Sequence, residues 1–364
     1  FLLDLGSNAL EEISKLETPV FIIDHHETSG KPGKNTTFIN PHLFKEEEIS
    51  AAGLTYLFSK QIDSGNKELA NLAVIGMVGD MLDREVSRIN NRIVEDAEVL
   101  IKKGLLLYPS TRPIHKALEF SSSMFISGIT GNPKGVLSLL RELDIKKENG
   151  SYKCLIDLSK DELSKLITAI LLRTKRDESE IIGNIYLIKF FDRLEDAREL
   201  SATINACSRL GYSDIALSLC LDNKEARERA QEIYADYKQH LVSALNYAEN
   251  NKIEEKNYII LNAGNNIKDT IIGTVASILS MSKHYREGTV IVAMSYDEEK
   301  IKVSARIVGR KGRNVREILE SAAEKVGGEA GGHHYAAGCL FSRKKEKEFL
   351  EILTKSLELE VVKV

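Results

Sequence analysis

Residues 1–26 predict a strand, a helix and a second strand in immediate succession. Residues 1–5 and 20–23 are short apolar runs typical of β-strands, and residues 9–16 between them have helical character. A βαβ unit requires a parallel sheet, and in such sheets the functional groups gather beyond the carboxyl ends of the strands. This feature therefore predicts an α/β fold with a site at the carboxyl end of its sheet.

Polar side chains stand at the predicted strand ends. Asp24, His25 and His26 directly follow residues 20–23, and Asp4 lies near the end of the first strand. Adjacent side chains at a strand end point in different directions, so one histidine can bind a metal while its neighbour faces a substrate. The alternative is that the aspartates cap the following helices and that the histidines are solvated.

A third carboxylate, Asp80, ends the apolar helix predicted over residues 68–83. Burying this carboxylate is costly unless it is paired or bound to a cation. With Asp4, Asp24 and a histidine it forms an oxygen- and nitrogen-donor set, which suits manganese or magnesium better than structural zinc. The four cysteines are scattered without a CxxC pair, which also argues against zinc and favours a reducing cytoplasm.

A glycine-rich segment, residues 327–338, is predicted to form a turn that binds phosphate. Gly331 and Gly332 allow the backbone to approach a ligand closely, and His333 follows them. Backbone N–H groups and the imidazole could then hold a phosphate or a terminal nucleotide. A purely structural turn is the alternative.

A basic stretch, residues 300–316, has seven cationic residues and no acidic one, in a chain of net charge −4. It begins with a predicted strand, residues 300–308, on which Ser304 and Arg306 share one face. Such a patch can hold a phosphodiester backbone, and binding would then weaken as salt rises. A solvated charged face is the alternative. Residues 309–312 also match the GxxG loop of RNA-binding KH modules, which is the weaker interpretation.

The middle of the chain predicts a different architecture. We expect a polar helix over residues 84–103, a long connection over 108–135 and helices over 136–182, with no recognisable chemical motif. A long charged helix is predicted over 223–250, after which strands and helices alternate again. Two α/β lobes joined by helices would leave a cleft between them. No apolar run approaches the roughly 20 residues that span a bilayer, so no membrane association is expected.

These motifs together resemble the DHH–DHHA1 phosphoesterases. The resemblance lies in the Asp-x-Gly run at Asp4, the DHH triplet at Asp24, the aspartate at position 80 and the GGHxxAAG run that begins at Gly331. Residues 110–117, 128–133 and 205–209 are similar to the archaeal RecJ-like branch, which includes the GINS-associated nuclease. The resemblance implies a parallel-sheet DHH domain at 1–105, a helical insertion or interaction region at 106–190, connector helices at 191–250 and a smaller α/β DHHA1 domain at 251–364.

The resemblance also implies roles for individual residues. Asp24 would orient His25, and His26 would face the scissile phosphate. Two manganese or magnesium ions are implied, one of which activates a water molecule for in-line attack. The implied sets are Asp24, His25 and His26 for catalysis, Asp4, His25 and a buried Asp80 for metal, and Arg306, His333, Gly331, Gly332, Ser304 and, more weakly, Arg209 for substrate.

The expected function is that of a cytoplasmic exonuclease acting on single-stranded DNA, or RNA, in replication or repair. Its partners would be single-stranded nucleic acid and GINS or another replication or repair protein. Two alternatives stay open: a phosphodiesterase of short oligoribonucleotides or cyclic dinucleotides, and a non-catalytic structural subunit of the replicative helicase. The family pattern includes a histidine and paired aspartates on an earlier strand, so we expect the natural protein to extend upstream of Phe1.

Overall fold

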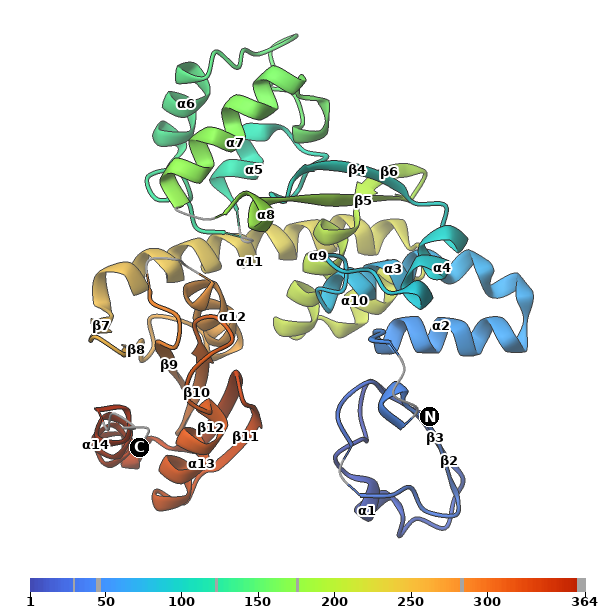
Figure 1. Ribbon diagram of the computed structural model, residues 1–364, viewed down its shortest axis with the longest axis vertical. Helices are drawn as coiled ribbons and strands as arrows, with labels where there is room; N and C mark the ends of the chain where they lie inside the picture. Colours follow the sequence, from blue (N-terminus) through green and yellow to red (C-terminus); the bar gives the residue numbers. More distant parts are fainter. Residues whose placement is uncertain (29, 44–46, 122–123, 175–176, 282–284, 359–364) are drawn as a thin grey trace.

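The computed structural model comprises residues 1–364 and describes all of them except 29, 44–46, 122–123, 175–176, 282–284 and 359–364. In Figure 1 a small N-terminal sheet and a larger C-terminal sheet lie on opposite sides of an opening, below the long helix α11 (Lys224–Asn251). A helical module lies above α11. Among the described residues, no helix is long and apolar enough to cross a membrane.

The N-terminal sheet is parallel, as predicted. Its strands, in sheet order, are β1 (Leu2–Leu3), β2 (Val20–Ile23) and β3 (Thr36–Ile39). The helix between the first two strands, α1 (Leu10–Ile13), is shorter than the predicted residues 9–16. The hydroxyl of Ser14 donates to the carbonyl oxygen of Glu11 at 2.7 Å, and such a bond competes with continuation of the helix.

Two helices follow this sheet in the chain. Helix α2 (Ala51–Ile62) packs on α3 (Ala70–Gly79), which is buried on nearly all sides. The polar helix predicted over residues 84–103 is wrong in its second half, because α4 (Arg88–Asp96) is followed by a strand. Glu98 has a φ of 52°, which a right-handed helix cannot continue.

That strand belongs to a second, antiparallel sheet. Its members, in sheet order, are β4 (Leu100–Leu105), β5 (Ile182–Phe190) and β6 (Arg193–Asp196). The sequence analysis predicted none of the three strands. β4 is mostly exposed, with two lysines at its centre, and it is held as a strand by its pairing with β5, far along the chain.

Residues 106–181, between β4 and β5, form a separate helical module, which we call the insertion. Its helices are α5 (Ile114–Glu119), α6 (Pro133–Glu142), α7 (Lys160–Thr174) and α8 (Glu178–Ile181). The long connection predicted over 108–135 is therefore wrong. Ile114 and Leu118 of α5 are buried in the insertion's own hydrophobic core. This burial offsets the conformational entropy that is lost when the proline-rich segment becomes ordered.

Three helices then lead from β6 to the C-terminal lobe. They are α9 (Ala197–Arg209), α10 (Ser213–Cys220) and α11. Helix α9 packs on both α3 and α11, so it contacts the N-terminal core on one side and the long connector on the other. The long charged helix predicted over residues 223–250 is confirmed by α11.

The C-terminal lobe is a six-stranded sheet with helices, and most of its elements match the prediction. In sheet order its strands are β11 (Glu329–His333), β12 (Ala336–Ser342), β10 (Lys300–Ile307), β9 (Val290–Asp297), β8 (Tyr258–Asn262) and β7 (Ile253–Glu254). The helices are α12 (Asp269–Ser280), α13 (Val315–Lys325) and α14 (Glu346–Glu358). The predicted glycine-rich turn over 327–338 is instead a hairpin of β11 and β12, because its glycines pair in register across the two strands.

Candidate active site

The ends of β1 and β2 bring the predicted polar residues together. Leu3 pairs with Ile23, so Asp4 follows one strand directly beside the residues that follow the other. The Nε2 atom of His25 lies 3.4 Å from Oδ1 of Asp4, and the Nδ1 atom of His26 lies 3.9 Å from the same oxygen. Asp4 has a φ of 64°, a left-handed conformation that aspartate adopts more readily than most residues other than glycine.

Asp80 completes this group from a different element. It follows α3, and its Oδ2 atom lies 4.0 Å from Nε2 of His25. The expectation that Asp80 is buried is wrong, because its side chain is 40% exposed beyond the last buried turn of α3. Partial burial raises its pKa, the charge of His25 lowers it, and the neighbouring Asp4 carboxylate raises it again.

Asp24 is the buried anchor of the site, with 1% of its surface exposed. Its Oδ2 atom accepts hydrogen bonds from the backbone and hydroxyl of Ser7, at 3.0 and 2.6 Å. Its Oδ1 atom lies 2.6 Å from Nδ1 of His26 and accepts the backbone N–H of His25. The expectation that Asp24 orients the ring of His25 is therefore wrong. Alternate residues of an extended segment share a side, so the carboxylate meets the ring of residue 26.

The hydrogen bonds to Asp24 predict how the stability of the metal-free chain depends on pH. Burial alone would raise the pKa of Asp24, but the bonds from Ser7 and His26 outweigh it and lower the pKa from 3.8 to about 2. The carboxylate thus stabilises the fold above pH 4, and this contribution disappears as the pH falls through 2. In urea denaturation at pH 7, Asp24→Asn should lower the free energy of unfolding by about 2 kcal/mol.

A matched control for this prediction is Asp236→Asn, on the exposed side of α11. It should change the free energy of unfolding by less than about 0.5 kcal/mol at any pH. If Asp24→Asn and wild type differ as much near pH 2 as at pH 7, the carboxylate does not act through its charge.

The cluster is chemically suited to a divalent cation. One ligand atom from each of Asp4, His25 and His26 lies within 4.8 Å of the others, and Asp80 adds a second carboxylate. Two atoms on opposite sides of one small cation would be about 4.2 Å apart. The Nε2 atom of His25 lies 3.4 Å from Asp4 and 4.0 Å from Asp80, which is compatible with a shared ion. The donor set fits manganese or magnesium. His26 lies beside it, but its Nδ1 atom is bonded to Asp24, so only its Nε2 atom is left for a ligand.

Two predicted phosphate-binding arginines meet on helix α12. Nε of Arg306, from β10, lies 3.0 Å from the hydroxyl of Ser277, and Nη1 of Arg209, from α9, lies 2.7 Å from that of Thr274. Within the described part of the chain, neither guanidinium pairs with a carboxylate. Burial lowers the pKa of Arg306, and the positive charge of Arg209 lowers it further. Two neighbouring guanidinium groups without a counter-ion form a site for an anion.

The other substrate-binding candidates differ in their surroundings. Ser304 shares the face of Arg306, as predicted, but it is buried. Its hydroxyl faces Gly273 of α12, where an added Cβ would lie only 3.2 Å from the hydroxyl oxygen. His333 is exposed at the end of β11. A Cβ at Gly332 would lie 2.5 Å from the backbone of the facing strand, whereas a Cβ at Gly331 would meet nothing. Gly332 is therefore needed for the close pairing of the hairpin strands, whereas the backbone at Gly331 is accessible to a ligand.

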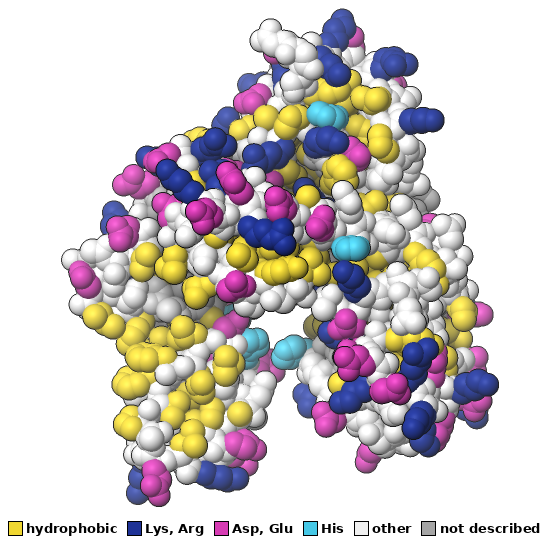
Figure 2. All heavy atoms as spheres, turned by 180° about the vertical axis from the view of Figure 1, so that it is seen from behind, with side chains coloured by type: hydrophobic (Ala, Val, Ile, Leu, Met, Phe, Trp, Pro, Cys, Tyr) yellow, Lys and Arg dark blue, Asp and Glu magenta, His cyan; other side chains and the backbone are white. Residues whose placement is uncertain are grey.

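Two cavities line the inner side of the lobes. One, of about 570 Å³, is bounded by Asp4, Asp80 and Arg209, together with Asn205 of α9. The other, of about 740 Å³, joins Arg84, just after α3, to the part of the C-terminal lobe that includes Arg306. In Figure 2 histidine side chains lie on both sides of the opening between the two lower lobes. The predicted cleft is present, and both lobes contribute residues to it.

Several residues of this site were missed in the sequence. Ser7 fixes Asp24, while Thr274 and Ser277 hold the two arginines. None of the three lies in a chemical motif, because a single serine or threonine carries no sequence signal of what it will contact. Asn205, which lines the cavity, was singled out only as part of the segment around Arg209.

Fold and site together define a two-lobed α/β architecture with an aspartate–histidine cluster on the inner side of one lobe. The sequence matches the DHHA1 domain family over residues 255–359 and the DHH-CID domain family over residues 107–180. The chain therefore contains segments of the DHHA1 and DHH-CID domain families, and its fold is RecJ-like.

Relatives of this chain span most of its length. An uncharacterized protein of Methanocaldococcus jannaschii is 29% identical over 96% of this chain and 78% of that protein. CDC45 from Entamoeba histolytica matches with a TM-score of 0.64 and 11% identity, over 98% of this chain and 84% of that one. RecJ from Thermus thermophilus, solved in complex with Mn²⁺, matches with a TM-score of 0.58 and 17% identity, over 98% of this chain and 44% of that one. At these identities the solved structures establish the fold alone.

Proposed function

We propose that this chain is a metal-dependent, RecJ-like exonuclease that hydrolyses the phosphodiester bonds of single-stranded DNA or RNA. One observation carries the proposal: Asp4 and Asp80, two members of the aspartate–histidine cluster, line the same cavity as Arg209, which has no carboxylate partner among the described residues. A phosphodiester needs both an activated nucleophile and groups that bind its negative charge. The aspartate–histidine cluster would activate the nucleophile, and Arg209 and Arg306, which both contact α12, would bind the negative charge.

Each side chain has a distinct task in this proposal. Asp4, His25 and Asp80 would hold manganese or magnesium, which supplies an activated water molecule and neutralises developing charge. Asp24 accepts the Nδ1 proton of His26, so the opposite nitrogen, Nε2, is left to face the phosphate. Arg306 and Arg209 would hold the phosphate of the strand, with His333 beside the terminal nucleotide.

The alternatives differ in substrate or in activity. A phosphodiesterase of short oligoribonucleotides or cyclic dinucleotides would use the same groups on a smaller substrate. A non-catalytic subunit of the replicative helicase would not need the aspartate–histidine cluster. The structural similarity to CDC45 is the observation that favours this alternative. We further propose that the insertion contacts GINS or another replication or repair protein, because it is a separate module with its own core.

End-labelled single strands test the proposal directly. We expect manganese to stimulate stepwise cleavage from an end and chelation with EDTA to abolish it. Dinucleotides should be cleaved more slowly than long strands, whereas the reverse order would favour the small-substrate alternative. Absence of both manganese-stimulated cleavage and a calorimetric manganese-binding signal would contradict the proposal and favour the non-catalytic subunit.

Arg306 should contribute to binding the strand rather than to the fold. Loss of a charge-assisted hydrogen bond typically costs about 1.5–3 kcal/mol, so Arg306→Ala should weaken single-strand binding by about 10- to 100-fold. The slope of log K against log salt should fall by about one. Fluorescence anisotropy across a range of salt concentrations measures both values.

Lys300→Ala is the control for this prediction, because Lys300 lies on the same strand and is exposed. It should change affinity by no more than about twofold. If both variants lose affinity equally, or if Arg306→Ala weakens binding without changing the salt slope, Arg306 does not contact a phosphate.

A further inference from the structure

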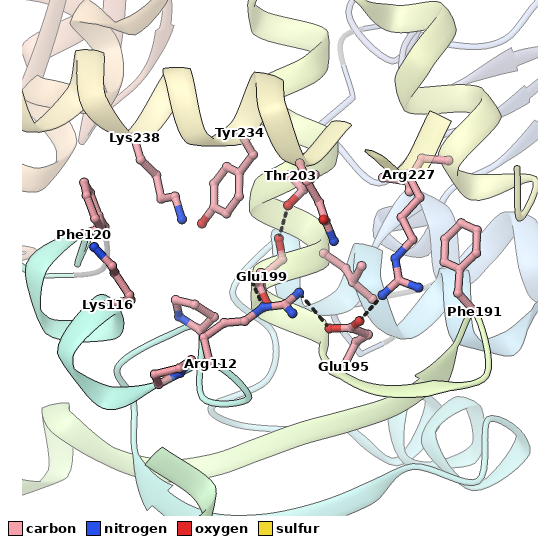
Figure 3. A pocket seen from close by; sticks show the side chains of 15 residues that line it. Arg112, Lys116, Phe120, Phe191, Glu195, Glu199, Thr203, Arg227, Tyr234 and Lys238 are labelled. Atoms are coloured by element: carbon pink, nitrogen blue, oxygen red, sulfur yellow. Dashed lines mark hydrogen bonds and ion pairs between the residues drawn. The ribbon is translucent and has the colours of Figure 1, made fainter. Parts of the chain in front are cut away.

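A further cavity, of about 370 Å³, lies where the insertion meets α9 and α11. Its volume is within the range of small-molecule sites. The insertion supplies Arg112, Lys116 and Phe120, and α11 supplies Tyr234 and Lys238. In Figure 3 the Lys238 and Tyr234 side chains extend from α11 toward Arg112 and Glu199 on the opposite wall.

Helix α9 separates this cavity from the proposed active site. Glu199, Leu200 and Thr203 line the cavity beside the insertion. Residues 201, 204, 205 and 209 of the same helix line the cavity that contains Asp4 and Asp80. At 3.6 residues per turn these two sets lie on opposite faces of α9. The proposed exonuclease function therefore makes no use of the cavity beside the insertion.

The charges in the cavity are only partly balanced. Two arginines and two glutamates form a ladder, in which Arg112 contacts both Glu199 and Glu195, and Arg227 contacts Glu195. Lys116 and Lys238 are left over. Their ammonium nitrogens lie 5.2 and 5.7 Å from the centre of the same Phe120 ring. Two positive charges thus lie beside the same aromatic ring at one end of the cavity.

Lys238 is the less compensated of the two lysines. Lys116 has Glu119 at 3.0 Å, outside the cavity, whereas Lys238 has no ion pair within the described part of the chain. Its nearest groups are aromatic, with the Tyr234 ring centre at 4.4 Å. Burial lowers the pKa of Lys238, Glu199 opposes this effect, and the charges of Arg112 and Lys116 add to it. A partly buried ammonium of this kind is stabilised by an external anion.

We propose that this cavity binds a small molecule that carries a phosphate monoester, held by Lys238 and Lys116. Phosphate monoesters carry close to two negative charges at neutral pH, which matches the two lysines. The aromatic rings of Phe120 and Tyr234 beside them provide a flat apolar wall for an attached base or sugar. The phosphate is the shared chemistry, and a nucleoside 5′-monophosphate and free inorganic phosphate are its two sources.

The absence of tryptophan from the chain allows a site-specific test. Phe120→Trp places the only indole at the cavity, and the chain with this single change is titrated with adenosine 5′-monophosphate, ribose 5-phosphate and inorganic phosphate. We expect a saturable change in fluorescence with at least one probe at millimolar concentrations. Tighter binding of the nucleotide identifies the base as part of the ligand, and equal binding of all three identifies phosphate alone.

Two further substitutions in this reporter chain decide the assignment. Lys238→Met should weaken binding by about tenfold or more, whereas Lys224→Met, on the exposed first turn of the same helix, should not. Arg306→Met should leave the titration unchanged, which separates this site from phosphate binding in the cleft. No saturable signal, or a signal insensitive to Lys238→Met, would overturn the proposal. Phe191→Trp, at the other end of the cavity, repeats the test if Phe120→Trp does not fold.

Discussion

Replacing His25 with alanine is expected to reduce manganese-stimulated cleavage by about 10³-fold. The Nε2 atom of His25 lies near the carboxylates of both Asp4 and Asp80. Replacing His25 therefore removes the nitrogen ligand of an ion that the two carboxylates would share. Metal ions contribute several kcal/mol to stabilising charge in the transition state, and each 1.36 kcal/mol corresponds to a factor of ten. Single-turnover cleavage of end-labelled strands, at saturating manganese, measures this effect.

Calorimetry distinguishes loss of the metal from loss of the fold. The His25→Ala chain should bind manganese at least about tenfold more weakly and should melt within a few degrees of wild type, because His25 belongs to no hydrophobic core. His240→Ala, on the exposed side of α11, is the matched control and should retain full cleavage. Cleavage by the His25→Ala chain at the wild-type rate would remove the metal cluster from the mechanism.

The largest loss of stability is expected for Asp196→Ala, away from the cleft. Asp196 is fully buried and accepts hydrogen bonds from the backbone and hydroxyl of Ser110, at 3.1 and 2.6 Å. It also pairs with the buried Arg198 at 2.7 Å. Removing it leaves the arginine charge uncompensated, which typically costs about 3–5 kcal/mol. Urea denaturation followed by circular dichroism measures the change in the free energy of unfolding.

Asp161→Ala provides the comparison on the surface. Asp161 is exposed in the first turn of α7 and pairs with Lys165 at 2.6 Å. Exposed pairs of this type contribute less than about 1 kcal/mol. A similar loss of stability in the two variants would mean that Asp196 does not act as a buried anchor between the insertion and α9.

The sequence predicted those elements in which consecutive residues show a regular spacing of apolar side chains or polar residues at a strand end. The parallel pairing of β1 with β2, the long α11 and the helix α13 all follow from contiguous residues. Strand β4 was mistaken for part of a helix because its residues show no alternation of apolar and polar side chains, and its partner β5 lies on the far side of the insertion. The first part of the insertion, residues 108–135, was mistaken for a connection because its prolines obscured the short helix α5, which is buried in the core of the insertion.

The sequence by itself determined which residue types stand at the strand ends, and therefore that carboxylates and imidazoles gather there. The tertiary structure alone decided which groups touch: Asp24 holds His26 rather than His25, and Arg209 joins Arg306 on α12. The physical reason is one of range. Strand-end placement follows from the direction of a few consecutive peptide units, whereas a hydrogen bond needs two segments positioned to within a fraction of an ångström, and packing across the whole molecule sets that position.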